Sequence, residues 1–313
     1  MDKKIIFISK DSTLFTDLIP TVTNEGYHTD HFSYDELSTS DIQWEQYRVC
    51  VIEHGDALKT FAVCDNARLK NTTLKIIFIT HNSPINVVED RIIHAYPDNI
   101  ISHVIPFIQT KIIATINKLF AEDIFGFSFY LTREHAIHTI TVNDSKQKKN
   151  YIKRIIEYGM NNEIRSRILG TIVNVLDEMI MNAIYNAPTD ESGNFIYANV
   201  DRREQVLLSE KQAATLSYVV NDYSIGLSMR DPFGSLKKDK VLYYLYKCKI
   251  KGRDQIDAHK SGAGLGIYKT FMNVNDFIIN IHAGKSTEFI VFISTGENYM
   301  KSETQSFNIF IQE

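Results

Sequence analysis

Residues 178–186 read Glu178-Met-Ile-Met-Asn182-Ala-Ile-Tyr-Asn186 and end a stretch of helical periodicity. The spacing of four predicts that Glu178, Asn182 and Asn186 lie above one another on one helix face. A carboxylate there can orient or deprotonate a nucleophile, and an amide oxygen can complete the oxygen shell of Mg²⁺. Taken alone, the pattern also fits a solvated helix face. The apolar stripe of the same helix comprises Ile168, Ile172, Val175, Leu176, Met179, Ile180 and Ala183.

A second segment, Val219-Val-Asn-Asp222-Tyr-Ser-Ile-Gly226, carries a β-branched run into an acidic residue and then a glycine. A carboxylate at a strand end can accept a hydrogen bond from an exocyclic amine, and a glycine lets a flat base approach the backbone. The alternative is a plain strand-to-turn sequence.

A third segment, Ser261-Gly262-Ala-Gly264-Leu-Gly266-Ile-Tyr-Lys-Thr, places glycines at alternate positions before a helical pattern. Such a loop frees backbone N–H groups at a helix N-terminus to bind phosphate oxygens. It is not a Walker A loop, because no Gly-Lys-Ser/Thr follows.

In this order the three segments resemble the N, G1 and G2 boxes of the GHKL superfamily, the ATPase fold of gyrase, heat-shock chaperones, MutL and histidine kinases. The resemblance implies an α+β sandwich of the Bergerat type that binds ATP and Mg²⁺. Ser224 departs from the G1 pattern Asp-x-Gly-x-Gly, and we expect it to narrow the adenine pocket. The resemblance implies that Glu178 is the activating base, Asn182 the Mg²⁺ ligand and Asn186 a further nucleotide contact. By the same resemblance, Asp222 binds the adenine amino group and Gly226 lines the base pocket. The residues that surround the phosphates would be Gly262, Gly264 and Gly266.

Between the second and third segments lies Asp231-Pro-Phe-Gly234, which looks like the F box of histidine kinases. We expect a helix over Ser235–Lys251, with Ser235 as its N-cap and Gly252 as its stop. The region is rich in lysine, which suits either a lid over a triphosphate or a solvated basic face. Lys260, next to the glycines, is the predicted phosphate contact.

The remaining pattern of this half predicts an α+β layer. Two helices fit between Lys148 and Ala187. The predicted strands are Ala136–Val142, Val206–Leu208, Thr215–Asn221, Phe277–His282 and Glu288–Ser294.

The first half alternates short apolar runs with mixed segments, which predicts an α/β doubly wound domain. We place the domain boundary near residue 125, giving domains 1–125 and 126–313. The predicted strands are Ile5–Ser9, Val49–Glu53, Lys75–Thr80 and Ile100–Val104, and the predicted helices are Thr13–Glu25, Ala57–Leu69, Val87–His94 and Thr110–Ala121.

This first domain resembles the receiver domain of response regulators in strand order and length. Its functional positions depart from that family: Lys10 and Asp11 stand for the acidic pair, Glu53 for the phosphate-accepting Asp and Thr80 for the Ser/Thr. Ile105, before Pro106, replaces the lysine. We therefore expect a degenerate receiver that docks a partner or, alternatively, one in which Glu53 imitates a permanently charged acceptor.

Composition fits an ordinary globular protein, with 44% hydrophobic and 23% charged residues. A net charge of -4 does not favour nucleic acid as a partner. Cys50, Cys64 and Cys248 have no paired spacing, which argues against disulfides or a zinc site and favours the reduced cytosol. The start, before Lys10, is too short for a signal-peptide core, and no apolar run predicts a membrane span, so we expect a cytoplasmic protein.

Three functions fit these expectations. The first is a cytoplasmic signalling protein that transfers the γ-phosphate of ATP to a Ser or Thr of a partner, as in anti-sigma-factor kinases, with the receiver-like half selecting or regulating that partner. The second is an ATP-gated binding switch without catalysis, or a relative of histidine kinases without its own phosphorylatable His, since neither His135 nor His138 has the expected context. The third, a gyrase- or MutL-like ATPase on DNA, fits by fold alone. A homodimer is compatible with all three.

Overall fold

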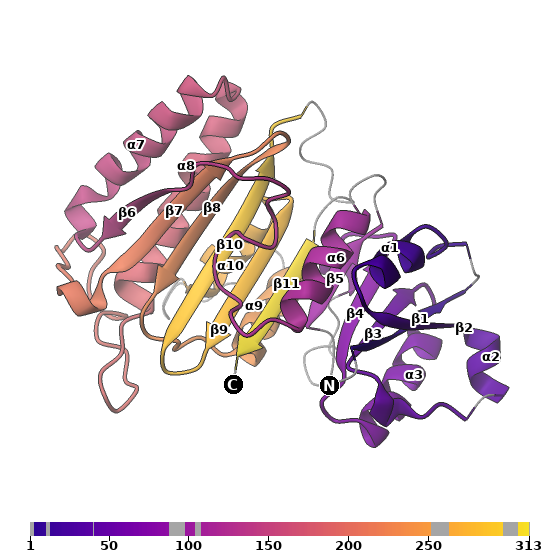
Figure 1. Cartoon of the computed structure of the whole chain (residues 1–313). Coiled ribbons are helices and arrows are strands. Elements are labelled where there is room, and N and C mark those ends of the chain that lie inside the picture. The colour runs from indigo at the N-terminus through magenta and orange to yellow at the C-terminus, as the bar shows by residue number, and fades with distance from the viewer. Residues whose placement is uncertain are drawn as a thin grey trace. The chain divides into compact units, whose positions relative to one another are not determined.

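The computed structural model describes residues 3–10, 13–39, 41–87, 98–103, 108–251, 263–296 and 306–312. The chain is a mixed α/β protein that forms two compact units (Figure 1). The first unit is Met1–Glu122 together with Ser306–Asn308, and the second is Asp123–Gln305 together with Ile309–Glu313. The division therefore lies close to the predicted position, and a short C-terminal segment joins the first unit.

The first unit contains a parallel sheet in the order β2-β1-β3-β4-β5, one of the common orders of doubly wound folds. Its central strands are apolar on both faces, so Ile5–Ile8 are fully buried. Ser306–Asn308, the start of β11 (Ser306–Gln312), pair antiparallel with β5. The parallel strands are β1 (Lys4–Ser9), β2 (His28–Ser33), β3 (Val49–His54), β4 (Lys75–Thr80) and β5 (Asn99–Ser102).

Helices cover both faces of this sheet. α1 (Leu18–Asn24) and α6 (Ile108–Leu119) supply Val22 and Ile112 to one core cluster with the strands. On the other face α3 (Ala57–Lys70) places Phe61 with its ring centroid 6.3 Å from that of Phe78. The helix begins at Ala57 because the Asp56 carboxylate accepts a hydrogen bond from the Lys59 N–H. Short helical segments follow β2 and precede β3: α2 (Tyr34–Thr39) and the 3₁₀ turn η1 (Trp44–Gln46).

Several predicted bounds in the first unit need correction. The helix predicted from Thr13 begins only at Leu18, because Pro20 fits a helix only in its first turn. β2 and α2 were not predicted, because β2 is a half-exposed strand of mostly polar residues without apolar alternation. The predicted strand Ile100–Val104 ends at Ser102. The predicted helix Val87–His94 lies mostly outside the described residues, and α4 (Pro84–Val87) precedes it.

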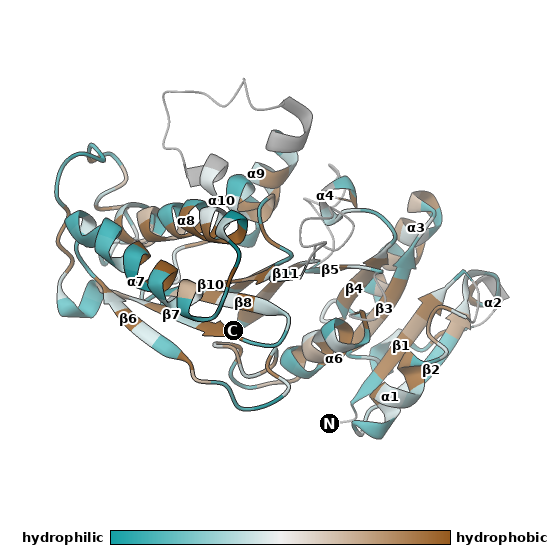
Figure 2. Ribbon diagram, turned by 90° about the horizontal axis from the view of Figure 1, so that it is seen from above, coloured by the Kyte–Doolittle hydropathy of each residue, from teal (hydrophilic) through white to brown (hydrophobic). Residues whose placement is uncertain are grey.

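The second unit is a two-layer α+β arrangement. Its antiparallel strands follow the order β9-β10-β8-β7-β6, and the rest of β11 is next to β9. Figure 2 shows α7, α8 and α10 on one side of the sheet. The elements are β6 (His138–Val142), α7 (Lys148–Asn161), α8 (Ser166–Met181), β7 (Ala214–Val220), β8 (Ser224–Asp231), α9 (Lys238–Lys251), α10 (Ala263–Phe271), β9 (Asp276–His282) and β10 (Ser286–Ser294).

Two predictions for this unit were wrong, and one strand was not predicted. Val206–Leu208 is not a strand, since Leu207 makes only an isolated bridge with Asp144. Ser235 does not cap a helix: α9 begins at Lys238, and the Ser235 hydroxyl donates to the Ala187 carbonyl oxygen at 3.0 Å. The strand β8 was missed, because Asp222 and Gly226 read as turn signals. Gly252 and Lys260 lie outside the described residues.

The segment Ser166–Asn186 is long and apolar enough to cross a membrane by length and composition alone. Half of its most apolar window is buried inside the protein. A core helix of a soluble protein meets the same criteria, and α8 packs against α7 and α10 as such a helix does.

Candidate functional site

The first predicted box ends in a π-helical turn. α8 widens over Asn182–Asn186, where the Ala187 N–H donates to the Asn182 carbonyl oxygen five residues back. The Asn186 side-chain amide donates to the Asn182 side-chain oxygen at 2.8 Å, so the two amides lie in contact as their spacing predicts. Single π turns inside helices frequently mark functional sites, because they redirect side chains at the cost of regular pairing.

The third predicted box meets the first through Gly266. A β-carbon at Gly266 would lie 2.5 Å from Glu178 Oε2 and 3.7 Å from Asn182 Nδ2. Only a glycine permits this approach. One turn further along α10, Lys269 forms an ion pair with the Glu178 carboxylate at 3.3 Å. Glu178, Asn182 and Gly266 are thus brought together, and Glu178 carries a cationic partner that the sequence did not predict.

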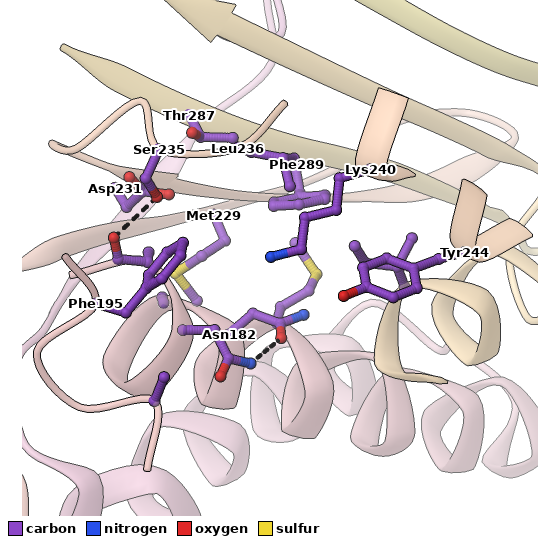
Figure 3. A pocket seen from close by; sticks show the side chains of 16 residues that line it. Asn182, Phe195, Met229, Asp231, Ser235, Leu236, Lys240, Tyr244, Thr287 and Phe289 are labelled. Carbon is purple, nitrogen blue, oxygen red and sulfur yellow. Dashed lines mark hydrogen bonds between the residues drawn. The ribbon is translucent and has the colours of Figure 1, made fainter. Parts of the chain in front are cut away.

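A cavity of about 100 Å³ opens beside the π-helical turn (Figure 3). One buried water needs roughly 10–15 Å³, so the cavity has room for part of a small ligand. Its walls are largely apolar, with a few polar groups among them. The lining residues are Met179, Asn182, Ala183, Asn186, Ala187, Phe195, Ala198, Met229, Asp231, Ser235, Leu236, Lys240, Tyr244, Ile267, Thr287 and Phe289.

Asp231 and Thr287 supply the buried polar groups of this cavity. They are direct partners across β8 and β10, and are 5% and 1% exposed. Burial raises the pKa of Asp231 to about 6, although the backbone N–H groups of Phe233, Gly234 and Thr287 favour the charged form. Thr287 Oγ1 has no hydrogen-bond partner among the described residues. A carboxylate and an orphaned hydroxyl at an apolar wall can together bind a ligand with a donor and an acceptor side by side.

The turn after β8 holds Asp231 in position. Gly234 has a φ of +60°, and a β-carbon there would lie 2.1 Å from the His282 carbonyl oxygen. The Gly234 carbonyl in turn accepts a hydrogen bond from the Gly284 N–H at 3.2 Å. The turn is therefore locked against the β9–β10 hairpin, and the Phe233 N–H donates to the Asp231 carboxylate at 2.9 Å.

Lys240 brings a cation from α9 to the cavity. Figure 3 shows its ammonium group among the lining side chains, between Phe289, Asn182 and Tyr244. The Lys240 Nζ lies 5.1 Å from the ring centroid of Phe195 and 5.9 Å from that of Tyr244. These contacts hold a flexible cation at the cavity, where it can meet an anionic ligand.

The second predicted box is not brought to the cavity. Asp222 lies in the turn between β7 and β8 and forms an ion pair with Arg133. β8 rises about 3.3 Å per residue, so its two ends, and hence Asp222 and Asp231, are separated by more than about 20 Å. Gly226 faces the opposite side of the sheet, where a β-carbon would lie 2.8 Å from the Phe292 ring and 3.0 Å from the Phe127 ring.

Of the three glycines in the third predicted box, the structure describes Gly264 and Gly266. Gly264 and Gly266 both lie within α10, close to its first residue Ala263, and not in a loop before it. Gly262 lies outside the described residues, as does the start of the third box. Within the described residues, α10 begins at Ala263.

In the first unit, the predicted receiver positions gather at the carboxyl ends of the strands. The Glu53 carboxylate accepts from the Lys10 N–H at 2.7 Å and contacts His81 Nε2 at 3.2 Å. Thr80 is buried, and its hydroxyl oxygen accepts from the Asn82 N–H at 3.1 Å. The Glu53 carboxylate is thus already occupied by contacts with Lys10 and His81. Asp11, Ile105 and Pro106 lie outside the described residues.

Burial and the neighbouring His81 lower the pKa of His103, although Glu53 opposes this. His81 and His103 have ring centroids 4.9 Å apart. Among the described residues of the chain, no group of three or more His, Cys, Asp and Glu side chains is arranged to hold a metal ion.

Sequence reasoning missed Asp231, Thr287 and Lys269. Asp231 stood in a recognised motif but was not placed at a strand end, because β8 was not predicted. The contacts of the other two residues join positions far apart in the chain, and no spacing in the sequence predicts them. No protein-family model matches this chain, and no curated protein matches it in sequence.

Proposed function

We propose that the second unit is a nucleotide-binding domain of the Bergerat type, which binds ATP with Mg²⁺. The observation that carries the proposal is the buried pair of Asp231 and Thr287 at the wall of an apolar cavity that also includes Asn182 and Asn186. The Asp231 carboxylate would accept from the adenine amino group, and the Thr287 hydroxyl would bind the neighbouring ring nitrogen. Met229, Ile267 and Phe289 would enclose the flat faces of the base.

This assignment replaces Asp222 by Asp231 as the reader of the base. The Asp222 carboxylate is exposed and paired with Arg133, so water would compete for any hydrogen bond that it forms with a base. A buried acceptor lacks that competition, so it discriminates between an amino group and a carbonyl far better. Adenine should therefore be preferred over guanine.

The amides of Asn182 and Asn186 suit the magnesium ion that accompanies a triphosphate. Mg²⁺ is usually bound by one or two protein oxygens together with phosphates and waters, so a protein cage of carboxylates is not required. Asn182 Oδ1 is the ligand we assign. When bound, the ion would neutralise charge on the phosphate oxygens. Gly266 lets the Glu178 carboxylate lie directly against α10, beside Asn182.

For the whole chain we propose a cytoplasmic signalling protein that transfers the γ-phosphate to a Ser or Thr of a partner protein. Glu178 would accept the proton of the attacking hydroxyl. The first unit, with the parallel 2-1-3-4-5 order of its sheet and Glu53 at the strand ends, would select the partner as a degenerate receiver-like domain. Nothing in this role requires phosphorylation of that unit.

The experiment uses γ-phosphate-labelled ATP and Mg²⁺ in a lysate of the source cells. The purified full chain is compared with Glu178→Ala. Acid-stable label on another protein, lost with the variant, supports the transferase. Label equal to the variant's background contradicts it, and would leave the nucleotide-binding role to be judged by titration.

The ion pair between Lys269 and Glu178 favours a second candidate, an ATP-gated binding switch without turnover. A carboxylate oxygen that is held in an ion pair is not directed at the hydroxyl of a partner protein. If the pair persists with nucleotide bound, Glu178 does not act as a base. Lys269→Met separates the two: ATP hydrolysis that appears in this variant and is absent from the wild type supports the switch, whereas hydrolysis by the wild type that is not faster in the variant supports the transferase.

A further inference from the structure

Two neighbouring arginines in the loop after the π-helical turn are both exposed but have different partners. Arg203 pairs with the Asp201 carboxylate, with Nη2 2.7 Å from Oδ2 and Nε 3.1 Å from Oδ1. Arg202 pairs with no carboxylate among the described residues. Its Nη2 donates instead to the side-chain oxygen of Asn186 at 2.9 Å.

Tyr185 fixes the position of Arg202. The Arg202 guanidinium lies over the Tyr185 ring, 4.4 Å from its centroid. Tyr185 is fully buried, and its hydroxyl donates to the Glu204 carbonyl oxygen at 2.9 Å, which anchors the loop beyond Arg202. Both the backbone and the side chain of Arg202 are therefore held to the end of α8, so little conformational entropy remains to be lost when a ligand binds.

The charge of Arg202 is only partly compensated. Burial lowers the pKa of its guanidinium, while Tyr185 and Glu178 act in the opposite direction. A guanidinium without a carboxylate partner keeps its charge and its remaining donors available to an anionic ligand. Arg203, by contrast, has its pKa raised by its bond to Asp201. The sequence neighbours thus differ in that only Arg202 has its charge available to a ligand.

Arg202 is connected to the cavity through a short chain of hydrogen bonds. It donates to Asn186, and Asn186 donates to Asn182, the two amides that line the cavity. A ligand whose base lies against Asp231 and whose anionic end reaches these amides would also reach the guanidinium. The planar, multidentate donor of an arginine matches phosphate oxygens better than a lysine does.

We propose that Arg202 binds the phosphate chain of the nucleotide, and so makes the site select di- and triphosphates over adenosine. This inference rests on the proposed nucleotide site but concerns a different part of the ligand. Tyr185 is then a positioning residue, which holds the arginine without contacting the ligand.

The test is calorimetric titration of the full chain with ATP, adenosine and inorganic tripolyphosphate, each with Mg²⁺. The variants are Arg202→Gln, which keeps an amide donor for Asn186 but removes the charge, and Arg202→Lys, which keeps the charge. Arg203→Gln is the matched control. We expect Arg202→Gln to weaken ATP and tripolyphosphate by about tenfold or more, as the loss of a charge-assisted hydrogen bond does, while adenosine affinity is unchanged. Arg202→Lys should retain part of the affinity, and Arg203→Gln all of it.

Equal loss of ATP and adenosine in Arg202→Gln, or no loss of either, would overturn the inference, because Arg202 would then only support the loop or stand apart from the ligand. Wild-type binding of tripolyphosphate through Arg202 without adenosine binding would leave the inference standing and reject the proposed base pocket. Binding of adenosine with an ATP affinity independent of Arg202 would support the proposed base pocket and overturn the inference about Arg202. A wild-type protein that binds none of the three overturns both.

Discussion

Gly266 of α10 lies directly against the carboxylate of Glu178, so that a β-carbon on it would come within 2.5 Å of Oε2. Two segments 88 positions apart in the sequence meet at this point, and both belong to motifs that sequence analysis singled out. The contact leaves Glu178 no freedom on that side while Lys269 holds it on another. The placement of this carboxylate is therefore controlled by α10.

Gly266→Ala should move the Glu178 carboxylate with little change in stability. The clashing atom is the end of a side chain, which can rotate away, and the exposed ion pair that breaks contributes less than about 1 kcal/mol. A displacement of about 1 Å can lower turnover roughly 100-fold, so we expect ATP turnover to fall by about that factor. Measured turnover and thermal unfolding check this. Gly170→Ala, at a helix position with open space around it, is the control and should stabilise the fold by about 0.5–1 kcal/mol with turnover unchanged.

Asp231→Asn should make the protein more stable at neutral pH. The folded-state pKa of about 6 lies above the usual 3.8, so the folded protein keeps a proton that the unfolded chain loses. The carboxyl therefore lowers the free energy of unfolding as pH rises from about 4 to 6, by roughly 2–3 kcal/mol in all. Denaturant unfolding at pH 4 and pH 7.5 should show a stability gain for Asp231→Asn that is larger at pH 7.5. A gain independent of pH would mean that Asp231 titrates normally.

Nucleotide affinity should depend on pH through the same group. If the Asp231 carboxylate accepts the adenine amino hydrogen, protonation removes the acceptor, and ATP affinity falls as pH is lowered through about 6. Tripolyphosphate, which has no base, serves as the comparison for titration of the phosphates themselves. The account predicts that the ratio of ATP to tripolyphosphate affinity decreases below pH 6; a constant ratio contradicts the role of Asp231.

Gly234→Ala should be strongly destabilising. Its φ of +60° is unfavourable for alanine, and the new β-carbon would overlap the His282 carbonyl oxygen, which is backbone and cannot rotate away. We expect a loss of about 2–4 kcal/mol in the free energy of unfolding. Gly193→Ala, which has a φ of +81° but open space around it, isolates the backbone term and should cost about 1–2 kcal/mol. Similar losses of unfolding free energy in the two variants would show that the turn after β8 shifts to accommodate the methyl group.

The elements that sequence predicted well are those with strong local patterns. β1, β3 and β4 are continuous apolar runs, and α8 carries a regular apolar stripe that is buried as expected. β2 was missed because its side chains are half exposed and mostly polar. These outcomes follow from burial, since only an element with a buried face shows a regular repeat of apolar residues in the sequence.

The site was predictable only where its residues share one helix. The spacing of Asn182 and Asn186 fixed their contact, whereas the choice of Asp222 depended on where a strand ends. β8 contains Gly226 and Ser228 among its apolar residues, which interrupt the apolar pattern, so neither the strand nor its end at Asp231 was predicted. Thr287 joins Asp231 only through the antiparallel register of β8 and β10, which the sequence of neither strand specifies.

The most direct test of the account is a titration of the purified full chain with ATP and Mg²⁺, in the wild type, Asp231→Asn and Asp222→Asn. The account predicts that the wild type and Asp222→Asn bind ATP equally. Asp231→Asn should bind at least about tenfold more weakly, because one carboxylate oxygen becomes an NH2 donor while the backbone N–H groups compete for the remaining oxygen. Loss of affinity in Asp222→Asn with Asp231→Asn unaffected, or no binding by the wild type, would contradict it.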